Sequence, residues 1–128
     1  MKKLALALLM LALPAQAQDF AFRGQWETRF PDTNYTAIVL IDSERRVTLD
    51  SPMDNGRPAN YFGYVSEATE AKVVILLTDR TGVVKTYCAV RSADLLHCYS
   101  IRAQGSRSDN FLLVKVGPGP HRLTRASL

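Results

Sequence analysis

The sequence predicts an all-β domain, built as an eight-stranded antiparallel up-and-down barrel or a closely related β-sandwich. Apolar and polar residues alternate with a period of two along most of the chain, which is the pattern of half-buried strands. Turn-forming residues interrupt that pattern at short intervals, and no long helical pattern separates the strands. Two cysteines fall where antiparallel pairing would place them opposite each other, so one cross-strand disulfide is expected.

The first 17 residues have the pattern of a cleaved export signal. Two lysines precede an apolar run over residues 4–13, and residues 14–17, Pro-Ala-Gln-Ala, supply the small residues of a cleavage site. The run is too short for a membrane-spanning helix, which needs about 20 apolar residues. No cysteine follows the site to carry a lipid anchor. We therefore expect a signal peptide over 1–17 and one domain over 18–128 that is periplasmic or secreted.

Net charge gives no support for a nucleic-acid partner. The whole chain has 16 lysines and arginines against 12 aspartates and glutamates, a formal charge of +4. Removing Lys2 and Lys3 with the signal leaves 14 basic residues and a charge of +2. The basic tail over 121–125 is typical of a solvated terminus rather than of a nucleic-acid interface.

Three strands are predicted in the first part of the domain. Residues 22–30 alternate between small or apolar residues and polar ones, so one face is expected inside. Residues 35–41 form a second strand, which is apolar on both faces. A polar hairpin turn at 42–45 leads into a third strand over 46–50, with its apolar residues facing in.

The middle of the chain holds the longest predicted loop and two further strands. Residues 51–59 contain two prolines and an Asn-Gly turn dipeptide, so we expect the loop there. A fourth strand follows over 60–66. Residues 66–72 include alanines and glutamates that favour helices, and one helical turn fits this stretch. A fifth strand over 73–78 ends at the turn signal of 79–82.

Three strands over 83–91, 95–102 and 111–116 complete the set of eight. The Gly-Pro-Gly-Pro run at 117–120 ends regular structure.

Some strands are apolar on both faces, notably 35–41, 73–77 and 111–116. A one-sided barrel would leave part of that surface in water, so we expect something to cover it. A protein partner, a second copy of the chain in a homodimer, or the second sheet of a sandwich would do so.

Cys88 and Cys98 are the only cysteines. If residues 92–94 form a three-residue hairpin loop, Arg91 lies opposite Leu95, and the antiparallel register places Cys88 opposite Cys98. An even number of cysteines in an exported protein favours a disulfide over two reduced thiols. The hairpin and the bond therefore support each other.

The triplet Gly24-Gln25-Trp26 resembles the Gly-X-Trp signature of the first lipocalin strand and is similar to the Gly-Thr-Trp opening of avidins. The resemblance covers these three residues and the strand count. It implies a calycin-like barrel in which Trp26 closes one end and a basic residue, Lys115 or Arg122, packs over it. The chain departs from lipocalins in its short tail, and residues 78–80 lack the tyrosine of their Thr-Asp-Tyr turn. The resemblance thus implies a fold and not a ligand.

Binding is the function that the composition favours. The first hypothesis is an exported barrel that binds a small apolar ligand or a protein partner near its open end. Its candidate ligand-binding residues are aromatic side chains: Trp26, Tyr61, Tyr64, Tyr87 and Tyr99.

The alternative hypothesis is a proteinaceous inhibitor or immunity-type protein that blocks a secreted hydrolase through a protruding loop. Two loops are candidates, 52–59 and 103–110. In the first of these, the candidate contact residues are Met53, Asp54, Asn55 and Arg57.

No catalytic or metal-binding pattern is evident in the sequence. The two histidines are His97, on a predicted strand opposite Ala89, and His121, in the tail. Scattered turn carboxylates lack the spacing of a calcium loop, and the cysteines are expected to be oxidised. We therefore expect a protein that is not an enzyme and that uses no metal or cofactor.

Overall fold

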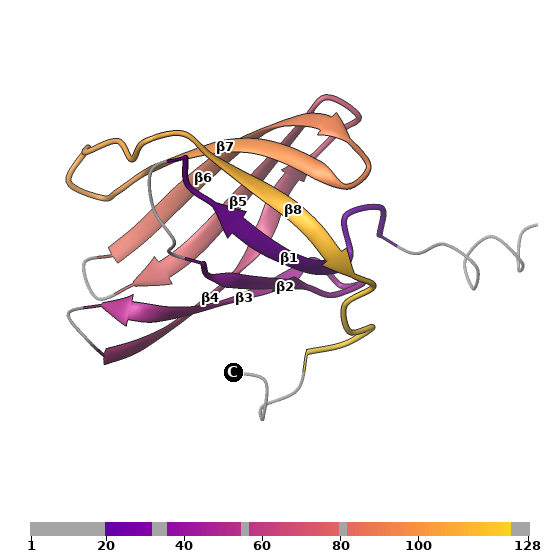
Figure 1. Cartoon of the computed structure of the whole chain (residues 1–128), viewed down its shortest axis with the longest axis horizontal. Helices are drawn as coiled ribbons and strands as arrows, with labels where there is room; N and C mark the ends of the chain where they lie inside the picture. The colour runs from indigo at the N-terminus through magenta and orange to yellow at the C-terminus, as the bar shows by residue number, and fades with distance from the viewer. Residues whose placement is uncertain (1–19, 32–35, 55–56, 80–81, 124–128) are drawn as a thin grey trace, which may run out of the picture.

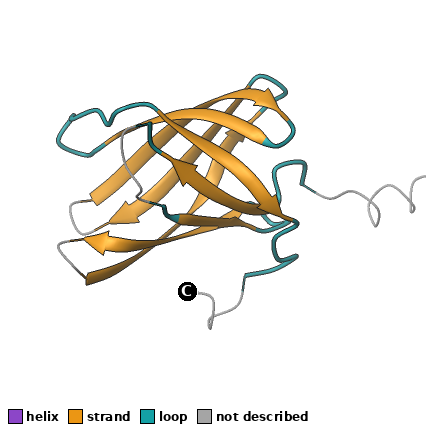
Figure 2. Ribbon diagram, in the orientation of Figure 1, coloured by secondary structure: helices purple, strands orange, loops and turns teal. Residues whose placement is uncertain are grey.

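Eight antiparallel strands close into a barrel in sequence order, with β8 returning to pair with β1 (Figures 1 and 2). The computed structural model describes residues 20–31, 36–54, 57–79 and 82–123, so the predicted signal peptide lies outside it. The predicted all-β, up-and-down fold is confirmed, and it is a barrel rather than a sandwich. The strands are β1 (Gly24–Arg29), β2 (Ile38–Ile41), β3 (Arg46–Asp54), β4 (Arg57–Ala68), β5 (Lys72–Asp79), β6 (Gly82–Ser92), β7 (Leu95–Ile101) and β8 (Phe111–Gly117).

The period-two pattern sets which side chains lie inside. In β1, Gly24, Trp26 and Thr28 are buried, whereas Arg29 is exposed. The same alternation fills the interior with one contiguous apolar core, to which every strand contributes at least one side chain that is 4% exposed or less. Closure also leaves no unpaired sheet edge among the described strands, which removes a site for aggregation.

The predicted hairpin between β6 and β7 is confirmed, and so is its disulfide. Cys88 lies opposite Cys98 in the ladder, with their Cα atoms 4.1 Å apart, and the bond lies inside the barrel. The turn is tighter than expected, because Ser92 rather than Arg91 pairs with Leu95. A bulge between Val90 and Ser92 takes up the extra residue, so the cysteine register is unchanged.

The predicted long loop at 51–59 is wrong, because β3 continues to Asp54 and β4 begins at Arg57. The register shifts between Ser51 and Asp54, so this part of the hairpin contains a bulge. A proline has no N–H to donate to a ladder but is tolerated at such an irregularity, which explains how both prolines fit within strands.

The helical turn that residues 66–72 would allow is also absent. β4 extends to Ala68, which pairs with Val73, and a second bulge lies between Val65 and Glu67. Thr69 then makes the turn with its own side chain, since its hydroxyl oxygen accepts hydrogen bonds from the N–H groups of Ala71 and Lys72. Sheet pairing and this turn outweigh the helix propensity of the segment.

One end of the barrel is closed by the segments that flank β1 and β8, which lie together in Figure 1. The guanidinium of Arg23 donates to the carbonyl of Gly119 at 2.9 Å, and the N–H of Ser43 donates to the carbonyl of His121 at 3.0 Å. Leu123 is buried beneath this end. The opposite end, at the left of Figure 1, holds the β3–β4 hairpin tip and the loop from β7 to β8.

Candidate functional site

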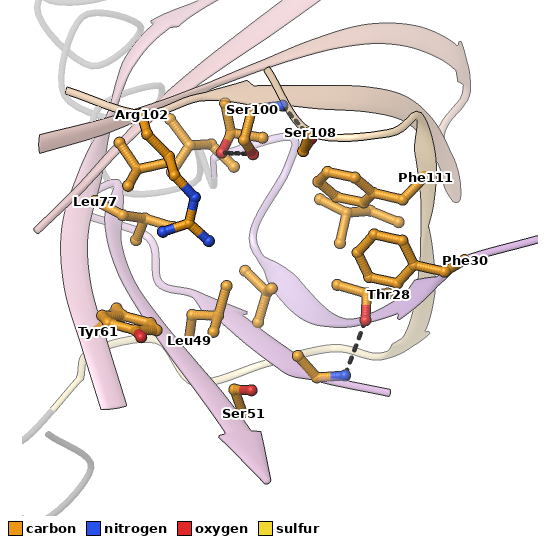
Figure 3. A pocket seen from close by; sticks show the side chains of 16 residues that line it. Thr28, Phe30, Leu49, Ser51, Tyr61, Leu77, Ser100, Arg102, Ser108 and Phe111 are labelled. Atoms are coloured by element: carbon orange, nitrogen blue, oxygen red, sulfur yellow. Dashed lines mark hydrogen bonds between the residues drawn. The ribbon is translucent and has the colours of Figure 1, made fainter. Parts of the chain in front are cut away.

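A cavity of about 240 Å³ opens at the end of the barrel away from the closing segments (Figure 3). All eight strands or their adjoining loops contribute to its lining. It lies where β1 and β7 end and where β6 and β8 begin. An up-and-down barrel therefore supplies side chains from both ends of the chain to a single site.

Most of the lining is apolar. Phe30 and Phe111 form one side, with ring centroids 5.1 Å apart, and Figure 3 shows the two rings together. Leu49 and Leu77 lie across from them, and Leu113 is buried in the lining. Such a surface favours the apolar part of a ligand, because both surfaces leave water on contact.

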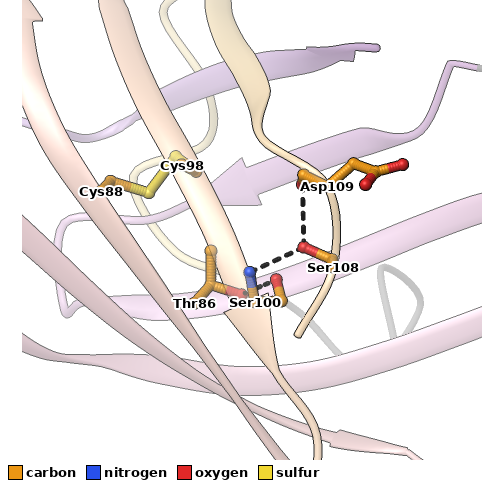
Figure 4. Close-up of a disulfide and its surroundings, with 6 residues drawn as sticks. All are labelled: Thr86, Cys88, Cys98, Ser100, Ser108 and Asp109. Atoms are coloured by element: carbon orange, nitrogen blue, oxygen red, sulfur yellow. Dashed lines mark hydrogen bonds between the residues drawn. A yellow bond between two sulfur atoms is a disulfide. The ribbon is translucent and has the colours of Figure 1, made fainter. Parts of the chain in front are cut away.

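A small set of hydroxyl groups forms a polar side of the cavity. Figure 4 shows their hydrogen bonds, next to the disulfide. The hydroxyls of Thr86 and Ser100 are 2.8 Å apart and hydrogen-bonded. The N–H of Ser100 donates to the hydroxyl oxygen of Ser108 at 2.8 Å, and that hydroxyl donates to the carbonyl of Asp109. In the Thr86–Ser100 pair only one hydroxyl donates to the other. The accepting hydroxyl thus keeps its own hydrogen for a further partner.

Arg102 brings a positive charge to the cavity. Its side chain reaches into the cavity in Figure 3 from the end of β7. The backbone is anchored, because the N–H of Arg102 donates to the carbonyl of Ser106 at 2.9 Å and its carbonyl accepts from the N–H of Gly105 at 2.8 Å. The guanidinium thus extends from a fixed point of the barrel.

Two of the five predicted ligand-binding aromatics lie inside the barrel, but at different levels. Tyr61 lines the cavity. Trp26 is fully buried near the closed end and donates from Nε1 to the carbonyl of Phe22 at 3.1 Å. Lys115 packs over its ring, with Nζ 5.8 Å from the centroid, whereas Arg122 is exposed and lies near Glu44. Of the two basic residues that the resemblance implied, Lys115 is the one in place.

The other three predicted aromatics lie on the outer surface, so the structure does not bring the five together. Tyr64 is 52% exposed on β4. Tyr87 and Tyr99 stack with centroids 5.4 Å apart and line, with His97, an outer pocket of about 410 Å³. The guanidinium of Arg107 covers Tyr99 at 4.0 Å. The predicted pairing of His97 with Ala89 is confirmed, and this face is the one away from the disulfide.

The residues predicted for a partner-binding loop lie at the tip of the β3–β4 hairpin. Met53 and Asp54 belong to β3 and Arg57 belongs to β4, whereas Asn55 lies outside the described residues. The second candidate loop, 103–110, connects β7 to β8 at the same end as the cavity (Figure 1).

Sequence reasoning missed Arg102, Ser100 and Phe111 as site residues. A usable signal existed for the hydroxyls. Thr86 and Ser100 occupy inward positions of strands otherwise filled by apolar residues, and a polar residue in such a position is informative. Arg102 continues the same inward series, which runs through 96, 98, 100 and 102, one residue past the end of β7, so a charged residue in that series was a usable signal as well.

Within the described ranges, no group of three or more histidines, cysteines, aspartates or glutamates could hold a metal ion. The same part of the chain has no helix of sufficient length and hydrophobicity to cross a membrane. The disulfide is typical of proteins that work in an oxidising compartment.

Comparison with known proteins shows no matching family model and no matching curated protein. The barrel architecture and the cavity are therefore the grounds on which a function is proposed below.

Proposed function

We propose that this chain is an exported binding protein that holds a small, largely apolar molecule in the cavity at the open end of its barrel. The observation that carries the proposal is the cavity itself, about 240 Å³ with a mainly apolar lining. A barrel of eight strands has an interior that its own side chains can fill, or that can hold one small ligand. Here one end is filled by the core around Trp26, and space remains at the other.

The lining suits this role in a second respect. Ligand sites combine a predominantly apolar wall with a few polar groups that fix orientation. The Thr86–Ser100 hydroxyl pair and Arg102 supply such groups on one side, and Phe30 and Phe111 supply the apolar wall. The proposed role is binding rather than catalysis.

A calycin relationship and export through a cleaved signal are part of the same proposal. Lys115 over the ring of Trp26 supports the first, since it matches the arrangement that the Gly24-Gln25-Trp26 resemblance implies. The disulfide between Cys88 and Cys98 supports the second.

Native mass spectrometry of the protein purified gently from its own periplasm or medium tests the proposal. A small added mass that leaves on denaturation is the expected result. The same spectrum reports the start of the mature chain, the disulfide and the oligomeric state. A bare chain that also takes up no added ligand contradicts the proposal.

A matched pair of variants locates the site. Val84 lines the cavity and Val83, its neighbour in β6, points outward and is 48% exposed. Val84→Phe should occupy the cavity and abolish binding of a small apolar probe such as octanamide, measured by ligand-observed NMR. Val83→Phe should leave binding unchanged. Equal binding by both variants would place the ligand elsewhere.

A protein partner is the second candidate, and the outer face of β4 favours it. Phe62 and Tyr64 are 57% and 52% exposed on this face, and their strand runs into the hairpin tip that includes Arg57. Exposed aromatic side chains are enriched in protein interfaces. If the chain inhibits a secreted hydrolase through this face, Phe62→Ser with Tyr64→Ser should raise the inhibition constant at least tenfold across a panel of secreted glycosidases and proteases. Absence of inhibition by the unaltered protein would rule out the candidate for that panel.

A further inference from the structure

The cavity is divided between an apolar side and a polar side, and the charge lies on the polar side. The rings of Phe30 and Phe111 form the first. Arg102 and the hydroxyl pair of Thr86 and Ser100 form the second. Figure 3 shows the Arg102 side chain directed into the same space that the two phenyl rings face.

Arg102 is the only residue with a full charge among the sixteen that line the cavity in the described part of the chain. Arginine stays protonated throughout the physiological pH range and has a planar fork of donors that matches a carboxylate. Its charge would not assist the binding of a neutral hydrocarbon, because bringing an apolar group against it removes water from the charge without replacing that water's hydrogen bonds. An oxyanion replaces them with charge-assisted hydrogen bonds.

The size of the cavity limits the ligand further. A volume of about 240 Å³ lies below the range of roughly 300–1,000 Å³ that is typical of ligand pockets. This space suits a short acyl chain or a single substituted ring and not a long lipid.

We propose that the ligand is a small amphiphilic carboxylic acid, an inference that rests on the proposed function. Its carboxylate would lie at Arg102, within reach of the Thr86–Ser100 hydroxyls, and its apolar part would lie against Phe30 and Phe111. The carboxylate adds to the contacts that Arg102 makes in the chain without ligand, or exchanges with them. Arg102 thereby favours a ligand with a negative charge, and the apolar part of the cavity limits the length of the ligand's hydrocarbon part.

Octanoate and octanamide form a matched pair of probes, because they share a chain and differ in charge at the head group. Titration calorimetry at pH 7 and low salt should show octanoate binding about ten- to a hundredfold more tightly than octanamide, the range expected for a hydrogen-bonded charge pair. Arg102→Gln should remove that preference, because it should weaken octanoate binding far more than octanamide binding. Arg107→Gln is the control, since Arg107 lies over Tyr99 on the outer surface.

The outcomes separate this inference from the proposed function. A preference for octanoate that is lost in Arg102→Gln and kept in Arg107→Gln supports the recognition of an acid. Equal affinity for both probes, or a preference that survives Arg102→Gln, overturns it while the apolar binding site stands. If neither probe binds to the unaltered protein, both the inference and the proposed function fail.

Discussion

Replacing Asp42 by alanine should release the end of the described chain from the barrel and lower its stability strongly. Asp42 follows β2, and its side chain is fully buried. Oδ1 accepts hydrogen bonds from the N–H groups of Glu44 and Arg46, both at 2.8 Å. Oδ2 accepts from Nε of Arg46 at 3.1 Å and from the N–H of Leu123 at 2.9 Å. One carboxylate thus joins the β2–β3 turn to the C-terminal segment.

The expected loss follows from what each donor meets after the substitution. The N–H of Leu123 is buried, and leaving it without an acceptor costs about 1–3 kcal/mol. The two turn N–H groups are only partly buried, so water replaces the carboxylate there and each bond lost costs about 1 kcal/mol. The ion pair adds little, because the side chain of Arg46 is 42% exposed and solvent screens it. We therefore expect Asp42→Ala to lower the free energy of unfolding by about 3–5 kcal/mol.

Urea unfolding followed by tryptophan fluorescence measures this loss, because Trp26 is the single tryptophan and is fully buried. Asp94→Ala is the control. Asp94 is exposed in the β6–β7 turn, and its replacement should change stability by less than about 0.5 kcal/mol. Hydrogen exchange gives a local measurement, since the amide of Leu123 should lose its protection in Asp42→Ala. A loss below about 1 kcal/mol, or an unchanged exchange rate at Leu123, would refute the reasoning.

Four further variants test other parts of the barrel. Replacing Cys88 and Cys98 together by alanine should lower the free energy of unfolding by about 2–3 kcal/mol, because the bond closes a loop with a sequence separation of 10; urea titration with and without reductant measures it. Gly63→Ala should cost more than about 3 kcal/mol or prevent folding, since a Cβ there would lie 1.7 Å from a carbonyl oxygen of β5. Gly117→Ala, whose Cβ would find its nearest neighbour at 3.7 Å, should be tolerated, and thermal melts of the two glycine variants measure the difference. Lys115→Met should shift the emission of the buried tryptophan and cost about 0.5–2 kcal/mol, and unchanged emission would argue against the cation–π contact.

The fold was largely predictable because the strands and hairpins of an up-and-down barrel follow from local sequence patterns. Alternation with a period of two is a local property, and the opposition of Cys88 and Cys98 follows from one hairpin. The errors arose where bulges shift the register. Between Ser51 and Asp54 and between Val65 and Glu67, an irregular ladder let the chain continue as strand through residues that favour turns or helices. A bulge is stabilised by pairing with a neighbouring strand, so the residues of one strand do not reveal it.

The site was less predictable, because alternation separates two faces without saying which is inside. The register of the β6–β7 hairpin puts Tyr87 and Tyr99 on the face away from the disulfide. That face is the outer one only because Cys88 and Cys98 are buried, and their burial depends on closure of the whole barrel. Aromatic character alone therefore selected a mixture of inner and outer residues.

Closure also explains why the two ends of the barrel differ in chemistry. Each strand passes through both ends, so its inward residues belong in turn to a closed level and to an open one. At the closed level, Trp26 and Leu123 fill the space, and the carboxylate of Asp42 accepts a hydrogen bond from the buried N–H of Leu123 in the C-terminal segment. Polar groups are expensive in such a core unless they are fully paired. At the open level Thr86 and Ser100 pair with each other and still face a cavity, so a polar inward residue costs less there. Under the proposed function, stability and binding thus fall to opposite ends of the same strands, so substitutions among the cavity residues can change the ligand without loss of the core that holds those residues in place.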